Sequence, residues 1–546
     1  MQLPLDVSLL EALSLWLLAI VLAYTGYVLV RSGGIGLVTN RLRRRFVLGV
    51  PWGTLIVVVA ILLVYFLVQG GGQRGGPVVV AFRSWSFSYP LGLVLAPFSH
   101  ANEGHITGNL LSTVAFAPVA EYALSHYTTA RGSHSFGSWQ TNPFVRILLF
   151  VVGVFVVGLV TSMFIPGALI GFSGVVFAFG GFALVTRPLL ALFGLLAERV
   201  VSLGYRALTD PVVIAQGREQ FVTPFWADVA VQGHAMGLLV GMFAGLFVVR
   251  RRNEWPDSAR VWFAVLVFTA TNSLYALYWY LSGTRYVLFQ ALGLGAIVLL
   301  ATVVAIAFAN ADRQLVARIN LSRREAAVGL LVCTVLALGA VAVPYNAISV
   351  SPGPEADTGV QVRDYTVTYA EDVPNRYIAA VDIPVLGESL SVNTSGVIVT
   401  SERRDAWEAV VPAGRLAIDG YAVVPVGGIG WRETVVVNRS TWSTVDGPST
   451  YKVFVKADGK PLRQVFTAEP ANVSAVIDNR SMQIRPAEAG FEIAVRRNGS
   501  VIAAEPLPIR GSNATVGGIT FNRSDGSLRA ISDGTRLTIA RRGRQS

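Results

Sequence analysis

Long apolar runs fill the first 345 residues of the chain. A helix must present about 20 mostly apolar residues to cross the hydrocarbon core of a bilayer. The pattern therefore predicts about ten transmembrane helices, and residues 70–103 predict a long, partly ordered loop between the second and the third. The expected helices lie at 8–30, 48–69, 104–124, 145–165, 171–187, 188–207, 228–249, 260–282, 286–309 and 325–344.

After residue 345 the pattern changes to short alternations of β-branched and polar residues. Two dipeptides, Asp458-Gly459 and Asn498-Gly499, separate such runs and are typical of β-hairpin turns. Residues 346–546 are therefore expected to form an all-β, sandwich-like region. The predicted fold is an all-α polytopic membrane protein with a C-terminal all-β domain.

Composition supports a membrane protein and excludes several other classes. Of the 546 residues, 53% are hydrophobic and 14% are charged, whereas soluble domains carry about 25% charged residues. The single cysteine, Cys333, excludes a disulfide within the chain. No solvated basic patch interleaved with aromatic residues indicates nucleic-acid binding.

Charge placement predicts the orientation in the membrane. Of the net charge of +11, all but +1 lies in the first 346 residues. Its arginines gather in loops that ten helices would place on one side, and an excess of arginine is typical of cytoplasmic loops. Both termini and the β domain are then expected outside the cytoplasm. Seven sequons for N-glycosylation agree with this placement, at Asn393, Asn438, Asn472, Asn479, Asn498, Asn513 and Asn522.

The five histidines fall into two groups. His126 and His134 lie in a polar loop and are expected to face water. His100, His105 and His234 lie at or within the starts of hydrophobic helices. Ionisable residues are costly inside a membrane, so these three are candidates for function.

A serine and a histidine offer a catalytic pair. Ser173 lies between Gly171 and Gly174 at the start of one helix, and His234 begins another that carries a glycine at every fourth position. Small residues let two helices approach closely, and a neutral imidazole within reach activates a serine hydroxyl. Each motif alone also fits ordinary packing. No carboxylate lies at a matching depth, so the sequence predicts a dyad.

A second pair offers neutral hydrogen-bond donors. His105 and Asn109 are four residues apart and share a helix face. Together with the backbone N–H of Ser173 they would form an oxyanion hole. The alternative is a polar pair that caps the helix start. All of these residues lie within about two turns of the expected outer end of their helices.

These motifs resemble those of the rhomboid intramembrane proteases. That family carries His-x-x-x-Asn on its second core helix, Gly-x-Ser-Gly on its fourth and His-x-x-Gly-x-x-x-Gly on its sixth. The resemblance covers residues 48–250, a six-helix core. The matching residues are His105, Asn109, Gly171, Ser173, Gly174, His234, Gly237 and Gly241, with supporting matches at His100, Glu121 and Phe177.

The chain also departs from the family pattern. Arg83, Trp85 and Phe87 replace imperfectly the Trp-Arg pair that is usual in the first outer loop. The expected organisation is an extra N-terminal helix and basic loop (1–47), the core (48–252), three additional helices (253–345) and the β region (346–546).

The resemblance implies a multi-pass serine endopeptidase of the cell membrane, without metal or cofactor. Its substrates would be transmembrane segments of other proteins, cut through a Ser173–His234 dyad. One rival is an inactive rhomboid-like protein that binds membrane proteins, for instance in quality control. A transporter is a third reading, which the lack of internal repeats and of paired half-helices disfavours.

Overall fold

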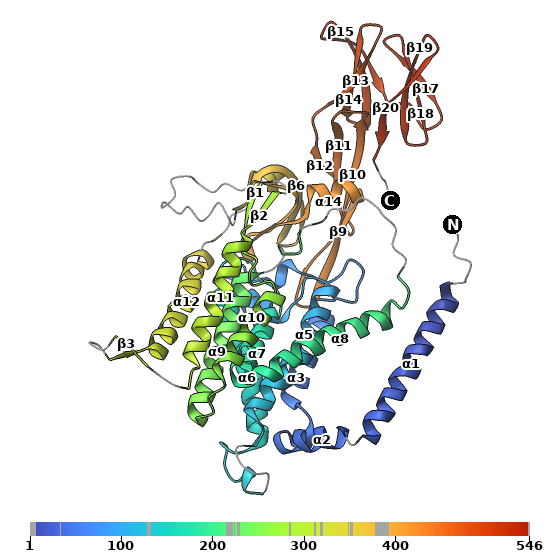
Figure 1. Ribbon diagram of the computed structural model, residues 1–546. Coiled ribbons are helices and arrows are strands. Elements are labelled where there is room, and N and C mark those ends of the chain that lie inside the picture. The colour runs from blue at the N-terminus through green and yellow to red at the C-terminus, as the bar shows by residue number, and fades with distance from the viewer. Residues whose placement is uncertain are drawn as a thin grey trace. The chain divides into compact units, whose positions relative to one another are not determined.

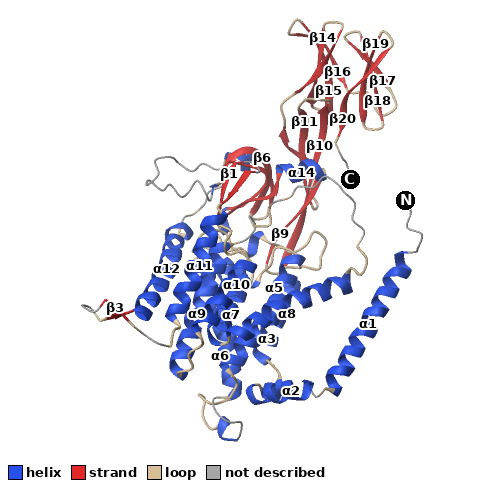
Figure 2. Ribbon diagram, in the orientation of Figure 1, coloured by secondary structure: helices blue, strands red, loops and turns tan. Residues whose placement is uncertain are grey.

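The chain folds into two compact units in the computed structural model (Figure 1). The first unit comprises residues 1–218 and 223–348, and the second comprises residues 219–222 and 349–546. Helices dominate the first unit and strands the second (Figure 2). The structure describes residues 7–543 except 33, 128–132, 214–221, 223, 227–229, 283–284, 311–312, 317–319, 348, 350–352 and 377–392.

A helix forms in each of the ten apolar runs of the first unit. A short helix, α4 (Pro90–Leu95), lies in the loop at 70–103. The basic segment after the first run, where a loop is expected, also forms a helix, α2. The long helices are α1 (Val7–Arg31), α2 (Gly34–Arg45), α3 (Trp52–Leu63, extended by a π-helical turn at Val64–Val68), α5 (Glu103–Leu124), α6 (Pro143–Met163), α7 (Ser173–Thr186), α8 (Pro188–Thr209), α9 (Val231–Arg252), α10 (Ser258–Thr271), α11 (Gln290–Ala307) and α12 (Arg323–Asn346).

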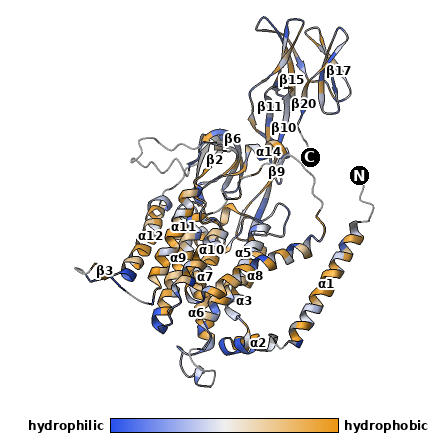
Figure 3. Cartoon of the chain, viewed as in Figure 1, coloured by the Kyte–Doolittle hydropathy of each residue, from blue (hydrophilic) through white to orange (hydrophobic). Residues whose placement is uncertain are grey.

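Six helices in the described part of the chain are long and apolar enough to cross a membrane: α1, α6, α8, α9, α11 and α12. Three shorter apolar stretches coincide with α3 and its π-turn, α7 and α10. Hydrophobic residues, coloured orange, predominate along these helices in Figure 3. The chain is therefore a multi-pass membrane protein, and a count of ten spans stays a prediction.

The predicted helices at 260–282 and 286–309 are wrong at their facing ends. α10 ends at Thr271, and β1 (Tyr278–Ser282) pairs with β2 (Arg285–Leu288) as an antiparallel hairpin. Aromatic and β-branched residues favour strands, and these strands read YWYLS and RYVL. A second short hairpin, β3 (Gln314–Val316) with β4 (Leu321–Ser322), precedes α12.

Polar side chains set the starts of four of the helices. Asn102, Asn142 and Asp257 each accept a backbone N–H bond from the first turn of α5, α6 and α10. Ser322 and Glu325 form a complete capping box on α12. Such caps supply partners for N–H groups that have none within the helix.

Helix α7 lies at the centre of the helical unit. Every residue of α7 after Ser173 is buried, and the surrounding core includes residues of α3, α5, α6, α8 and α9. The additional helices α10 and α11 contribute Val261, Phe268 and Ile297 to the same core. The residues at the start of α7 are thus held on a buried, rigid element.

The second unit consists of antiparallel sheets. One has four strands in the order β5-β6-β7-β8, another has the order β13-β14-β15-β16, and the largest has the order β12-β11-β10-β20-β19-β18-β17, with β9 also paired to β10. The elements are β5 (Val360–Val362), β6 (Tyr365–Pro374), β7 (Asn393–Ser401), β8 (Ala406–Pro412), α14 (Ala413–Asp419), β9 (Tyr421–Gly428), β10 (Trp431–Thr444), β11 (Ser449–Ala457), β12 (Arg463–Thr467), β13 (Ala471–Ile477), β14 (Arg480–Ala487), β15 (Gly490–Arg497), β16 (Ser500–Pro506), β17 (Asn513–Val516), β18 (Ile519–Ser524), β19 (Ser527–Ser532) and β20 (Thr535–Arg542).

Both predicted turns join paired strands. Asn498 and Gly499 link β15 to β16 with φ values of 48° and 83°, as a two-residue turn with positive φ at both positions requires. Asp458-Gly459 lies between β11 and β12. Residues from β13–β15 and β17–β20 share one apolar core around Phe521, so this β-rich region contains packed sheets.

Candidate active site

The backbones of α7 and α9 are in direct contact. A Cβ atom added to Gly237 would lie 2.0 Å from the carbonyl oxygen of Gly174, and one added to Gly241 would lie 2.0 Å from that of Ala178. Both distances are far below van der Waals contact, so only glycine fits at these positions. The glycine stripe of α9 therefore lies against α7, as close helix packing through small residues requires.

This contact brings Ser173 and His234 to neighbouring positions. Ser173 is the first residue of α7 and precedes Gly174, while His234 lies one turn before Gly237 in the first turn of α9. One turn after Ser173, the ring of Phe177 stacks on the imidazole of His234, with centroids 4.1 Å apart and planes 10° apart. The stacking fixes the orientation of the imidazole.

The buried Nδ1 atom of His234 has no hydrogen-bond partner. In a Ser-His-Asp triad this atom donates to a carboxylate. No carboxylate contacts it among the residues that the structure describes. Asp228, which the sequence places in the loop ahead of His234, lies outside the described residues.

The residues before Ser173 form a sharp bend next to α5. Gly171 has a φ of +125°, which favours glycine. A Cβ atom at this position would lie 2.6 Å from Nε2 of His105 and 3.7 Å from Nδ2 of Asn109. Both side chains of the predicted donor pair therefore lie against the backbone that leads into Ser173.

The two side chains present their N–H groups to the same place. Nδ1 of His105 accepts a long bond from the backbone N–H of Ala101, at 3.5 Å, so the ring proton is assigned to Nε2, the atom beside Gly171. Nδ2 of Asn109 is buried and has no hydrogen-bond partner. Buried amides are almost always paired, so this unpaired donor is unusual. Its position suits an acceptor that arrives during a reaction.

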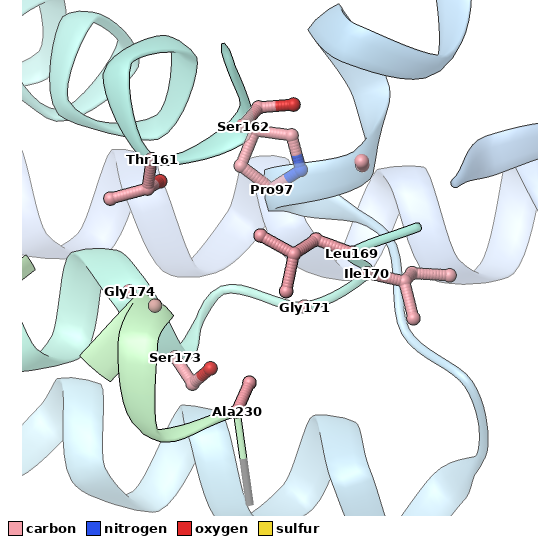
Figure 4. Close-up of a pocket in the computed structure, with 11 residues that line it drawn as sticks. Pro97, Thr161, Ser162, Leu169, Ile170, Gly171, Ser173, Gly174 and Ala230 are labelled. Atoms are coloured by element: carbon pink, nitrogen blue, oxygen red, sulfur yellow. The ribbon is translucent and has the colours of Figure 1, made fainter. Parts of the chain in front are cut away.

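A small pocket of about 30 Å³ adjoins Ser173. It is lined by Pro97, Ser162, Gly171 and Ala230, among others, and Figure 4 shows Ser173 at its edge. A site of roughly 10–15 Å³ holds one water molecule. The space beside Ser173 is thus large enough for water.

The outer loop supports the segment that carries Ser173. Nη1 of Arg83 donates to the carbonyl oxygen of Ala168 at 2.8 Å, and Ser84 and Leu169 exchange backbone and hydroxyl bonds of 3.0 and 3.1 Å. Trp85 is buried and donates to the carbonyl oxygen of Val80. In the sequence, Arg83 stands out only as an imperfect family match, and Ser84 does not stand out at all. No sequence spacing could reveal contacts between residues 85 positions apart.

His100 is a buried neighbour of the candidate site. Its backbone N–H and C=O both bond to the side chain of Gln69, at 2.8 and 2.9 Å. Its ring lies edge-on to that of His105, with centroids 5.2 Å apart. His100 therefore packs against His105.

Glu121 lies at the other end of α5, far from Ser173. Its carboxylate accepts bonds from the backbone N–H groups of Gly53 and Thr54, at 2.7 and 2.9 Å, and from the Thr54 hydroxyl at 2.7 Å. Nε2 of His126 lies 2.6 Å from the same carboxylate. The expectation that His126 faces water is wrong, because the loop after α5 turns back and buries this ring. His134 is exposed.

Among the described residues, no group of three or more His, Cys, Asp or Glu side chains could hold a metal ion. The chemistry available around Ser173 is that of a hydroxyl, an imidazole and neutral N–H donors. This set suits acyl transfer.

Comparison with known proteins identifies a family. Residues 88–251 match the family model of the Rhomboid domain. This segment contains α5 to α8 and all but the last residue of α9. It includes His105, Asn109, Gly171, Ser173 and His234. No curated protein and no solved structure matches the chain.

Proposed function

Because residues 88–251 place the chain in the rhomboid family, we propose that it is an active intramembrane serine endopeptidase. Its substrates are then transmembrane segments of other membrane proteins. The observation that carries the proposal is the buried, unpaired Nδ2 of Asn109 beside Gly171, together with His105. A protein that only binds its clients has no use for a buried, unsatisfied donor next to the bend that leads into Ser173.

In the proposed reaction, His234 accepts the proton of the Ser173 hydroxyl as the oxygen attacks the scissile carbonyl. The tetrahedral intermediate places a negative charge on the former carbonyl oxygen. Nε2 of His105, Nδ2 of Asn109 and the backbone N–H of Ser173 donate to that oxygen. Ser173 begins α7, so its N–H has no partner within the helix.

The imidazolium of His234 then donates its proton to the departing amine, and an acyl-enzyme forms on Ser173. A water molecule from the small pocket then attacks the acyl-enzyme, with His234 again acting as base and acid. Hydrolysis releases the second product and restores the Ser173 hydroxyl. Among the described residues, Nδ1 of His234 has no acidic partner. The proposed machinery is therefore a dyad in which Phe177 orients the imidazole by stacking.

The orientation derived from the arginines gives the proposal its direction. The starts of α5, α7 and α9 would then lie at the extracytoplasmic side of the membrane, and the β-rich region would be extracytoplasmic too. The seven exposed or partly exposed sequon asparagines agree with this placement. Cleavage is therefore expected near the outer end of the substrate helix.

The experiment is a cleavage assay with purified protein and a single-span substrate in proteoliposomes, run with fluorophosphonate labelling. Wild-type protein is expected to cleave the substrate and to be labelled at Ser173. The inactive, client-binding alternative predicts that the wild type binds the same substrate without product and without label.

A further inference from the structure

Asn346 is the last residue of α12, a helix outside the segment that matches the Rhomboid domain. The residue is fully buried. A buried polar side chain requires hydrogen-bond partners. The partners of Asn346 lie in the loops of the candidate site.

The side-chain amide of Asn346 bonds to the segment between α6 and α7. Nδ2 donates to the carbonyl oxygens of Met163 and Ile165, at 3.1 and 3.0 Å, and Oδ1 accepts from the backbone N–H of Gly167 at 3.4 Å. The backbone oxygen of Asn346 also accepts from the N–H of Phe87 at 2.8 Å. Asn346 thus bonds both to the segment between α6 and α7 and to the outer loop that contains Phe87.

These contacts lie where the chain leaves α6 for Ser173. The last carbonyls of a helix lack helical partners, and Asn346 supplies one for the carbonyl of Met163. Further along the same segment, Arg83 and Ser84 hold Ala168 and Leu169, and Ala96 accepts from the N–H of Gly171. Asn346 fixes the start of the segment, and the outer loop fixes its end.

The packing of α12 brings Asn346 to this position. A Cβ atom added to Gly339 would lie 3.6 Å from Cβ of Phe164 and 3.8 Å from Cε of Met236. Both would be ordinary van der Waals contacts. α12 therefore touches the segment that leads to Ser173 and also α9, two residues beyond His234.

We propose that Asn346 is a positioning residue, through which α12 sets the path of residues 163–167 and hence the placement of Gly171 and Ser173. The proposal rests on the proposed protease function. It assigns a role in catalysis to a helix that the rhomboid match does not cover.

The first test compares Asn346→Ala with Asn272→Ala. Asn272 follows the last residue of another additional helix, α10, and its side-chain amide donates to Phe268 and Thr271 of that helix. For Asn346→Ala we expect kcat and the rate of fluorophosphonate labelling of Ser173 to fall about 10- to 100-fold, as displacement of a reacting group by about 1 Å does. KM should change little, and Asn272→Ala should match the wild type.

The second test separates positioning from general loss of structure. In Asn346→Asp the carboxylate retains an acceptor for Gly167, but it repels the carbonyl oxygens of Met163 and Ile165. Protonation of the introduced carboxyl group restores one donor. The labelling rate relative to wild type should therefore rise as the pH falls, whereas the relative rate of Asn346→Ala should stay flat. Labelling is measured on monodisperse protein, so unfolded material does not contribute.

The outcomes are distinct. If Asn346→Ala cleaves and labels at wild-type rates while Ser173→Ala is inactive, the positioning role is wrong and the protease function stands. If the wild type neither cleaves nor labels, the protease function fails. Should Asn346→Ala not fold, a relative labelling rate of Asn346→Asp that does not rise at lower pH overturns the inference.

Discussion

Buried polar groups lack hydrogen-bond partners at the start of α5 and have them at its end. At its start, Nδ2 of Asn109 is buried without a partner, and both ring nitrogens of the neighbouring His100 are also unpaired. At its end, the Glu121 carboxylate accepts bonds from two backbone N–H groups, a hydroxyl and an imidazole. One helix therefore carries both an unsatisfied and a fully satisfied polar cluster.

The arginines extend this contrast. Arg146 donates to the carbonyl oxygens of Leu124 and Ser125, and Arg252 donates to those of Ala123 and Leu124. Residues that indicate topology in the sequence thus also cap the end of α5. A buried polar group without a partner costs about 1–3 kcal/mol, and a ligand that accepts a bond from Asn109 would remove this cost. The start of α5 is suited to reaction and its end to stability.

The largest expected effect is the loss of activity in Ser173→Ala and His234→Ala. Removing a nucleophile or its base typically costs at least about 10⁴-fold in turnover, so product and label should fall to background. Folding of Ser173→Ala, followed by melting temperature, should match the wild type.

Ser162→Ala is the matched control for the serine. Ser162 lines the same pocket, and its hydroxyl is buried without a partner. It should keep full activity. Label that persists in Ser173→Ala and vanishes in Ser162→Ala would show that the reactive serine is the other one.

Asn109→Ala should lower kcat about 10²- to 10³-fold, as loss of one oxyanion donor does. Its free energy of unfolding should not fall, because the substitution removes a buried donor that had no partner. Kinetics and thermal unfolding of the same preparation check both statements.

Asn102→Ala, unlike Asn109→Ala, should lower the free energy of unfolding. Asn102 caps α5 through the N–H of His105, so its loss should cost about 1 kcal/mol of stability. If Asn109→Ala instead loses stability and activity in proportion, the start of α5 is a structural cluster and the contrast between the two ends disappears.

Local patterns in the sequence predicted much of the start of α5 and its surroundings. The four-residue spacing of His105 and Asn109, the glycine stripe after His234 and the Gly171–Gly174 bend depend on short-range geometry, which is readable without a fold. The structure places these residues side by side. The helical runs were equally readable, except where aromatic residues after Thr271 form a hairpin.

The satisfied end of α5 could not be predicted in this way. The burial of His126 depends on a chain return that brings Val47 to His126 and Gly53 to Glu121. Asn346 likewise reaches Met163 across 183 positions. Such contacts have no spacing signal. The family pattern named Glu121 as structural, but nothing in the sequence identified its imidazole partner.

Glu121→Gln should lower the free energy of unfolding by about 3 kcal/mol, because the amide places N–H groups against the donors of Gly53 and Thr54. Thermal and denaturant unfolding in micelles would measure it. Glu103→Gln, at an exposed site on the same helix, should leave stability unchanged. Activity per folded molecule should persist in Glu121→Gln, since 16 residues, about 24 Å of helix, separate Glu121 from His105.

The smallest effect is expected for His126→Phe. Val47 donates its N–H to Nδ1 of His126, so Nε2 carries the proton that bonds to Glu121. Phenylalanine keeps the ring contact with Phe46 but loses both bonds, which predicts a loss of about 1–2 kcal/mol in the free energy of unfolding. His134→Phe, at an exposed site, should have no effect.

Combining Glu121→Gln with His126→Phe sharpens this last point. Partners in one hydrogen-bond network give non-additive losses, so the double variant should be less destabilised than the two single losses added together. Additive losses would mean that Glu121 and His126 act separately. A slower labelling of Ser173 in folded His126→Phe would mean that the two ends of α5 communicate, and the division between a reactive end and a stabilising end would then be wrong.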